Sequence, residues 1–146
     1  MTSPGNGRPP MGGVHHFSPT VTDVEASSEW YQRILGLQKI ARAPHHKSEE
    51  SGYAEILVDM AAGIMIGLHH HDGNDGGAAD ERRAGLDHIA FGVPERADLD
   101  NWAAWLDENG VPHDGVTDAT DPLPYSVLVF RDPDNIQLEM MWMAAP

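Results

Sequence analysis

Hydrophobic and polar residues alternate most regularly near the C-terminus of the chain. Residues 136–142 follow the period of two that a β-strand requires, and one face of this strand is apolar: Ile136, Leu138, Met140 and Trp142. The opposite face carries Glu139, whose carboxylate is costly to bury unless a cationic group meets it. A turn sequence, Asp-Pro-Asp-Asn, precedes the strand at 132–135. Glu139 therefore predicts a cationic partner, and the chain offers nine histidines.

The same kind of pattern predicts further strands and two helices. The further strands are 14–21, 37–43, 53–59, 64–71, 86–93, 111–116 and 125–131. The helices run from about residue 22 to 35 and from 95 to 109, where apolar residues recur at helical spacing. A capping-box pattern at 22–25 begins the first helix, and Gly36 and Gly110 follow the ends of the two helices.

These elements occur twice in the same order. A shift of 72 residues carries His16 onto His88, since 88 − 16 = 72, and it matches further positions: Trp30 with Trp102, Tyr53 with Tyr125, Ile64 with Ile136, Ile66 with Leu138 and Gly67 with Glu139. We therefore predict an α+β fold of two βαβββ modules in tandem. The modules form a curved, incompletely closed mixed-sheet barrel, with a helix packed outside each module.

The chain divides into four segments within one structural domain. Residues 1–13 are rich in Gly and Pro and are predicted to be a disordered tail, and residues 72–84 form a glycine-rich linker. The first module spans 14–71 and the second spans 85–146. A length of 146 residues, of which 40% are apolar, is enough for one shared core.

Charge and composition narrow the class of partner. A net charge of −14 repels nucleic acid and anionic membranes, so we expect a small-molecule substrate, no nucleic acid and no membrane. The sequence has no cysteine, no stretch long enough to cross a membrane and no visible signal peptide. We therefore expect a cytoplasmic protein.

The strand alternation places three potential metal ligands on the face opposite the helices. They are His16, His88 and Glu139, and two neutral imidazoles with one carboxylate suit a divalent ion and leave positions open. Such an ion would also compensate the burial of Glu139. In the first module the position equivalent to Glu139 is Gly67, which cannot ligate. His69 is next along this face and would replace the missing ligand if the register shifted by two residues.

The same inner face is predicted to carry side chains that line the cavity or contact substrate: Tyr53, Glu55, Leu57, Met65, His69, His71, Tyr125 and Met141. Glu55 is a candidate base with a raised pKa, although an exposed or arginine-paired Glu55 is the favoured alternative. His69, His70 and His71 cannot all face one site, because successive strand residues point to opposite sides. His45 gives no signal that sequence alone can interpret.

Four motifs, at 16–23, 30–37, 85–91 and 130–139, together resemble the vicinal oxygen chelate superfamily. That superfamily includes lactoylglutathione lyases, fosfomycin thiol-transferases, extradiol dioxygenases and bleomycin resistance proteins. The resemblance covers nearly all of the chain beyond residue 13. It implies that His16, His88 and Glu139 bind one divalent metal ion (Fe²⁺, Mn²⁺, Zn²⁺ or Ni²⁺). It also implies a homodimer, because relatives commonly pair their modules across subunits.

The resemblance leaves three functions open. The favoured one is a metal-dependent enzyme of the glyoxalase or dioxygenase type, which chelates a small substrate through two adjacent oxygens and uses Glu139 as a catalytic residue. One alternative is a small-molecule binding protein like the bleomycin resistance proteins, which the retention of all three ligands disfavours. The other is an antibiotic thiol-transferase, which needs basic contacts in a chain with nine Lys and Arg residues.

Overall fold

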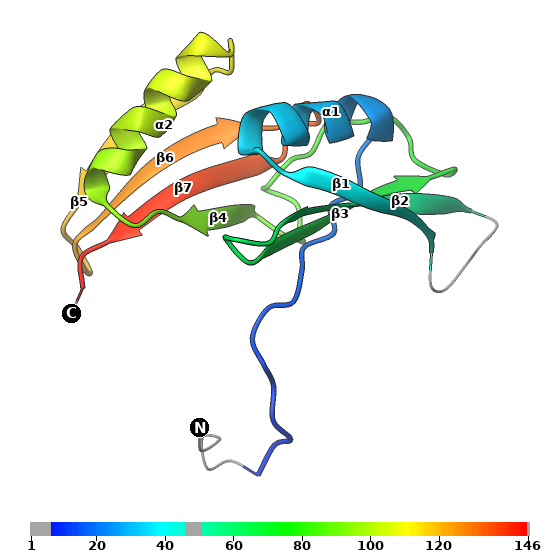
Figure 1. The fold of residues 1–146 in the computed structure, drawn as a ribbon, viewed down its shortest axis with the longest axis horizontal. Helices are drawn as coiled ribbons and strands as arrows, with labels where there is room; N and C mark the ends of the chain where they lie inside the picture. Colours follow the sequence, from blue (N-terminus) through cyan, green and yellow to red (C-terminus); the bar gives the residue numbers. More distant parts are fainter. Residues whose placement is uncertain (1–6, 46–50, 146) are drawn as a thin grey trace.

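The computed structural model describes residues 7–45 and 51–145 and contains two sheets, each covered by one helix. The first sheet has the strand order β1-β2-β3 and the second has the order β4-β7-β6-β5. The strands are β1 (Gln38–Pro44), β2 (Gly52–Asp59), β3 (Ile64–His71), β4 (His88–Gly92), β5 (His113–Ala119), β6 (Tyr125–Arg131) and β7 (Gln137–Met143). Helix α1 (Val24–Leu35) packs on β2 and β3, and helix α2 (Arg96–Glu108) packs on β5, β6 and β7 (Figure 1).

The two modules predicted from the sequence are present, and the pairing of strands reproduces the shift of 72 residues. In the first module Phe17 bridges to Ile66 and Thr20 bridges to His69, both in parallel. In the second module the equivalent parallel pairs are Ile89 with Leu138 and Gly92 with Met141. The predicted fold class is therefore confirmed, since every one of these four positions moves by 72 (89 − 17, 138 − 66, 92 − 20, 141 − 69).

The predicted strand 14–21 is present only as these two isolated bridges. Four backbone hydrogen bonds of 2.8–3.2 Å still attach residues 17–21 to β3, including one from the amide of His69 to the carbonyl of Pro19. Proline has no N–H, which interrupts a regular ladder, so the segment accepts hydrogen bonds at Pro19 without donating one there.

The hairpins of the two modules differ by one residue, and this difference overturns part of the sequence prediction. Leu57 pairs with Ile66, whereas the residue that pairs with Leu138 is Phe130, a shift of 130 − 57 = 73. In the first hairpin, residues 60–63 separate the paired Asp59 and Ile64. In the second, only residues 133–135 separate Asp132 from Ile136, whose carbonyl accepts a hydrogen bond from the Asp132 amide at 3.1 Å.

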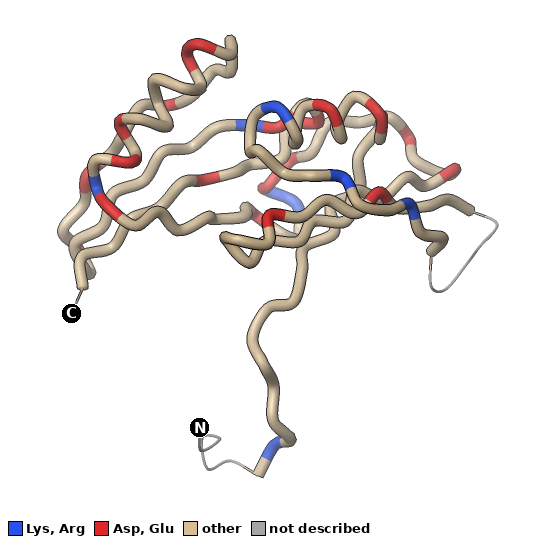
Figure 2. The backbone as a smooth tube through the Cα atoms, in the orientation of Figure 1, with Lys and Arg blue, Asp and Glu red and all other residues tan. Residues whose placement is uncertain are grey.

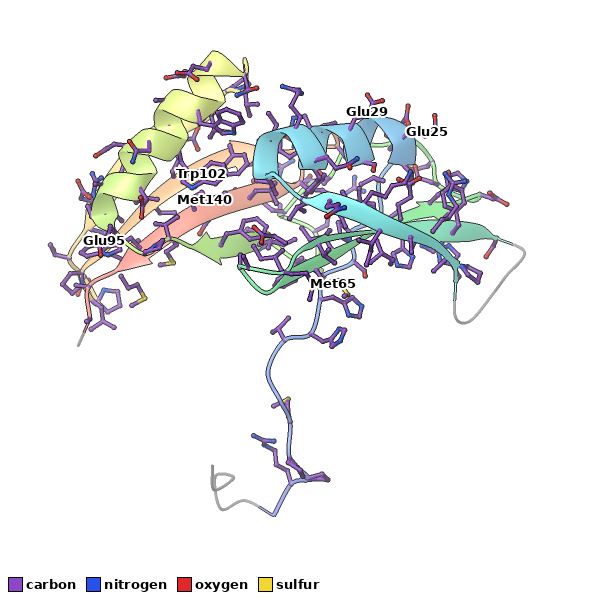
Figure 3. All side chains as sticks on the ribbon, in the orientation of Figure 1. Glu25, Glu29, Met65, Glu95, Trp102 and Met140 are labelled. Carbon is purple, nitrogen blue, oxygen red and sulfur yellow. The ribbon has the colours of Figure 1, made fainter. Side chains whose placement is uncertain are left out.

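A shift of one residue exchanges the two faces of a strand. The prediction that Tyr53, Glu55 and Leu57 line the inner face is therefore wrong, because all three point toward α1. Leu57 and Glu55 are fully buried there, at 0% exposure. Met65 does lie on the face of β3 away from α1, as predicted (Figure 3).

One apolar core runs through both modules and contains buried residues of each, among them Val24, Ile34, Leu57, Leu99, Leu128 and Leu138. The two helices also meet directly, because the indole N–H of Trp105 donates to the carbonyl oxygen of Ile34 at 2.9 Å. None of the described helices has the length and apolar character needed to cross a membrane.

The β6–β7 turn of the second module is tied to α1 of the first module through two buried carboxylates, Asp132 and Asp134. Tyr31 donates its hydroxyl to Oδ2 of Asp132 at 2.8 Å. Thr22 donates its amide and its hydroxyl to Asp134, at 3.1 and 2.6 Å. Thr22 is therefore not the helix cap that the capping-box pattern predicted; Asp23 caps α1 by accepting from the Ala26 amide at 3.0 Å.

Burial has opposite consequences for the two partners of this contact only in name, since it raises both pKa values. Burial raises the pKa of Asp132, and burial next to Asp132 raises the pKa of the Tyr31 hydroxyl. The hydroxyl therefore stays protonated and remains available as a donor to the carboxyl group.

We predict that Tyr31→Phe destabilises the protein by about 1–3 kcal/mol, because it leaves a buried oxygen of Asp132 without its donor. The measurement is urea unfolding at neutral pH. The matched control is Tyr125→Phe on the half-buried inner face, which should change stability by less than about 0.5 kcal/mol. Equal unfolding midpoints for Tyr31→Phe and wild type would contradict the role given to this hydrogen bond.

Candidate metal centre

His88 and Glu139 meet on the inner face of the second sheet. Strands β4 and β7 are parallel neighbours, with His88 beside Gln137 and Ala90 beside Glu139. The Nε2 atom of His88 lies 3.6 Å from Oε2 of Glu139. The His88 side chain is 40% exposed and that of Glu139 is 15% exposed, so a ligand from solvent can reach both donor atoms.

Asp87 fixes the orientation of the His88 ring. Its Oδ1 atom lies 2.7 Å from Nδ1 of His88, and a carboxylate oxygen accepts hydrogen bonds, so Nδ1 carries the proton. In the neutral ring Nε2 then holds the lone pair and faces Glu139. A carboxylate on one ring nitrogen with the other nitrogen directed at a metal is the usual surrounding of a metal-binding histidine.

A chain of hydrogen bonds continues from Asp87 to the segment predicted as a linker. Gln137 donates to Oδ1 of Asp87 at 3.1 Å, and Arg131 donates to the side-chain oxygen of Gln137 at 2.9 Å. Arg131 also donates twice to Glu81, at 2.9 and 3.0 Å. Hydrogen bonding from Arg131 lowers the pKa of Glu81 to about 2. The carboxylate is therefore charged at neutral pH and holds the linker against the second sheet.

The sequence interpretation missed these supporting residues. A signal was available for two of them, because Asp87 directly precedes His88 and Gln137 shares a strand face with Glu139. Asp87, Gln137 and Glu81 also line a cavity of about 260 Å³, together with Ser18 and Thr20 from the first module.

His16 lies on the segment that runs beside β4 but does not join His88 and Glu139. A cavity of about 200 Å³ is lined by His16, Ala90 and Gly92. The His16 side chain is exposed, and its Nδ1 atom lies 2.8 Å from Nδ1 of His15. Among the described residues, the one group of three potential ligand atoms within 4.8 Å of one another is His45, His69 and His71. The assignment of His16 as a ligand stays a prediction.

Gly67 occupies the position equivalent to Glu139, as the bridge between Phe17 and Ile66 requires. A Cβ atom at Gly67 would lie 2.9 Å from Oγ of Ser18 and 3.7 Å from Nε2 of His69. The missing side chain therefore makes room for Ser18, and His69 approaches the same place from two residues further along β3. Whether His69 acts as a ligand there stays a prediction.

Of the other predicted contact residues, Tyr125 and Met141 lie on the face that carries Glu139, and both are half-buried. Their contact with a substrate remains a prediction, as does that of His71. Tyr53 is instead covered by Arg42, whose guanidinium lies 4.1 Å from the centre of its ring.

Glu55 is an ion-pair partner under α1. Its Oε1 atom accepts hydrogen bonds from Lys39 at 3.1 Å and from Arg42 at 2.8 Å. Burial alone raises the pKa of Glu55, but hydrogen bonds from Arg42, Ser28 and Lys39 outweigh burial and hold the pKa below its usual value. The hypothesis of a base with a raised pKa is therefore wrong, and the arginine-paired alternative is confirmed.

Comparison with known proteins agrees with the fold and the inner-face donors. The model of the Glyoxalase/Bleomycin resistance protein/Dioxygenase superfamily matches residues 13–140, so the chain belongs to this family. A glyoxylase/bleomycin resistance protein/dioxygenase domain from Frankia sp. EAN1pec has a similar crystal structure, with a TM-score of 0.80 and 32% sequence identity over 92% of this chain and 100% of that one.

Two curated relatives point to different chemistry. MhqA of Bacillus subtilis, named as a ring-cleaving dioxygenase, is 26% identical over 88% of this chain and 39% of its own length. The metallothiol transferase FosB of Staphylococcus haemolyticus is 28% identical over 68% of this chain and 61% of its own length. The chain thus spans about two fifths of MhqA, and these relatives establish the family without establishing the reaction.

We predict that Asp87→Ala lowers the affinity for Mn²⁺ by about 10- to 100-fold, because His88 loses the partner that orients it. Mn²⁺ binding can be titrated by the electron paramagnetic resonance signal of the free ion. Asp72→Ala is the matched control, since Asp72 forms a similar pair with His70, at 2.9 Å. Equal Mn²⁺ affinity for Asp87→Ala and Asp72→Ala would rule out an orienting role for Asp87.

Proposed function

We propose that the protein is a metal-dependent enzyme of the glyoxalase and dioxygenase type that acts on a small molecule with two adjacent oxygens. The observation that supports this proposal is the pair of donor atoms 3.6 Å apart on β4 and β7, with the proton of the His88 ring held on the far nitrogen by Asp87. One neutral imidazole and one carboxylate suit a divalent ion such as Fe²⁺, Mn²⁺, Zn²⁺ or Ni²⁺.

A divalent ion at this place would supply Lewis acidity toward the substrate oxygens. The residues of the chain have separate tasks in this proposal. His88 binds through Nε2, and Asp87 keeps the ring proton on Nδ1. Glu139 binds through Oε2 and is the candidate acceptor of a substrate proton at its second oxygen. Tyr125 and Met141 on the same face provide apolar surface that excludes water from the bound substrate.

The similarity to MhqA favours an aromatic substrate with adjacent oxygens, such as a catechol. The thiol-transferase alternative suggested by FosB is weaker, because a phosphonate substrate needs cations. Lys and Arg are sparse over the whole molecule, whereas Asp and Glu follow both helices (Figure 2). Arg131, the cation near Gln137, already pairs with Glu81. The simple binding-protein alternative leaves the orientation of His88 by Asp87 without a use.

We propose that a second copy of the chain completes the site. His16 is exposed and is not gathered with His88 and Glu139 within one chain. A homodimer in which modules pair across subunits would bring His16 of one subunit to the His88 and Glu139 of the other.

We predict that His88→Ala and Glu139→Ala each lower the affinity for Mn²⁺ by at least tenfold, or about 1.4 kcal/mol, while the far-ultraviolet circular dichroism stays unchanged. Each substitution removes one of the two donor atoms. His113→Ala, a histidine whose ring binds Asp107 at 3.0 Å, is the matched control and should bind Mn²⁺ as wild type does. Wild-type affinity in either variant would remove that residue from the site.

The dimer is tested by mixing His16→Ala protein with Glu139→Ala protein. If the site combines two subunits, half of the sites in a mixed dimer carry all three ligands, and Mn²⁺ binding returns to those sites. Sedimentation at micromolar concentration provides the second measurement. A monomer, or mixed protein that binds no more Mn²⁺ than the separate variants, would contradict the shared site.

A further inference from the structure

Three histidines meet at one end of the first sheet, and none of them belongs to the pair His88 and Glu139. They are His45, one residue past β1, and His69 and His71 on β3. One ring nitrogen of each lies within 4.8 Å of one ring nitrogen of the others. His45 is 7% exposed, His69 is half-buried and His71 is exposed, so the cluster opens to solvent on one side.

The register of the sheet explains why the rings meet. Pro44 pairs with Tyr53, so the next residue, His45, comes beside Gly52, and Gly52 pairs with His71. The glycine has no side chain to separate the two imidazoles, whose centres lie 4.3 Å apart. A Cβ atom at Gly52 would collide with the His45 ring and with the carbonyl of His70, and the φ of +151° at Gly52 also disfavours any side chain.

A backbone contact fixes the protonation of His45. Its Nε2 atom lies 2.8 Å from the carbonyl oxygen of His70, which can only accept, so Nε2 carries a proton. In the neutral ring the lone pair is then on Nδ1, which lies 2.9 Å from Nδ1 of His69. A backbone carbonyl on the far nitrogen is a common arrangement around metal-binding histidines.

We propose that His45, His69 and His71 bind a transition-metal ion of the Zn²⁺ class through three imidazole nitrogens, with one position open to water. Imidazole suits Zn²⁺, Ni²⁺ and Cu²⁺, whereas a site without a carboxylate suits Mn²⁺ poorly. The ion takes the place of the proton that the two Nδ1 atoms of His45 and His69 now share. That proton leaves to solvent or moves to Nε2 of His69. The bound ion connects the end of β1 to β3 across β2.

The experiment uses protein without an affinity tag and the background His88→Ala/Glu139→Ala, which removes the donors of the proposed catalytic site. Zn²⁺ is titrated against a chromogenic chelator at pH 7.5. We expect the background protein to bind one equivalent of Zn²⁺. Adding His71→Ala should lower that affinity at least tenfold, and because His71 is exposed its removal leaves the core intact. Zn²⁺ should raise the melting temperature of the background protein and leave that of the His71→Ala protein unchanged.

His70→Ala in the same background is the matched control. Its ring faces away from the cluster and binds Asp72, and only its carbonyl serves His45, so Zn²⁺ affinity should stay as in the background. His69→Ala gives a second reading of the cluster, with folding checked by circular dichroism. The proposal is overturned if the background protein binds no Zn²⁺, or if His69→Ala and His71→Ala both bind it as tightly as His70→Ala does. The proposed catalytic site is tested separately with Mn²⁺, so failure of one site is distinguishable from failure of the other.

Discussion

The arrangement of the two modules depends on two carboxylates that are buried at their junction. Asp132 and Asp134 are 5% and 8% exposed, and burial of carboxylates is costly unless donors surround them. The donors come from both modules: backbone amides of the turn itself, and Tyr31 and Thr22 at α1. An apolar core would tolerate small displacements of one module against the other. These hydrogen bonds do not, because any displacement leaves a buried oxygen without its donor.

The same turn also decides which side chains reach the inner face. Because only residues 133–135 separate Asp132 from Ile136, β6 and β7 pair in a register that sets Glu139 opposite Val129. Gln137 then lies beside His88 and donates to Asp87, which orients the His88 ring. Docking of the modules and orientation of the metal donors are therefore consequences of one short segment, and a change in its length would disturb both.

The sequence predicts most of the fold, because hydrophobic periodicity and the shift of 72 residues reflect packing that both modules share. It fails at β2, where the match of Tyr53 with Tyr125 is a coincidence and the structural shift is 73. The better guide was the pair of turn aspartates. Asp59 accepts from the amide of Ala62 as Asp132 accepts from that of Asp134, and 132 − 59 = 73. Aligning Asp59 with Asp132 would have placed Glu55 under α1.

The site was partly predictable for a related reason. Strand parity places His88 and Glu139 on one face, but it cannot tell how far His16 lies from them. The contribution of His45 depends on the register of β1 against β2 and on the missing side chain at Gly52, and neither follows from local periodicity. Long-range pairing is set by the whole sheet, whereas periodicity reports only which face a residue takes.

Two modules with one backbone plan thus present different donors at equivalent places. Where the second module has Glu139 and Met141, the first has Gly67 and His69. The carboxylate in the second module favours ions that accept oxygen ligands, and the imidazoles of the first favour ions that prefer nitrogen. Because Gly67 and Gly52 leave space beside these rings, the first module gains its histidine cluster by losing side chains that a copy of the second would have kept. Divergence at a few inner-face positions, on a scaffold fixed by the buried turn, is therefore sufficient to give each half of the protein its own metal preference.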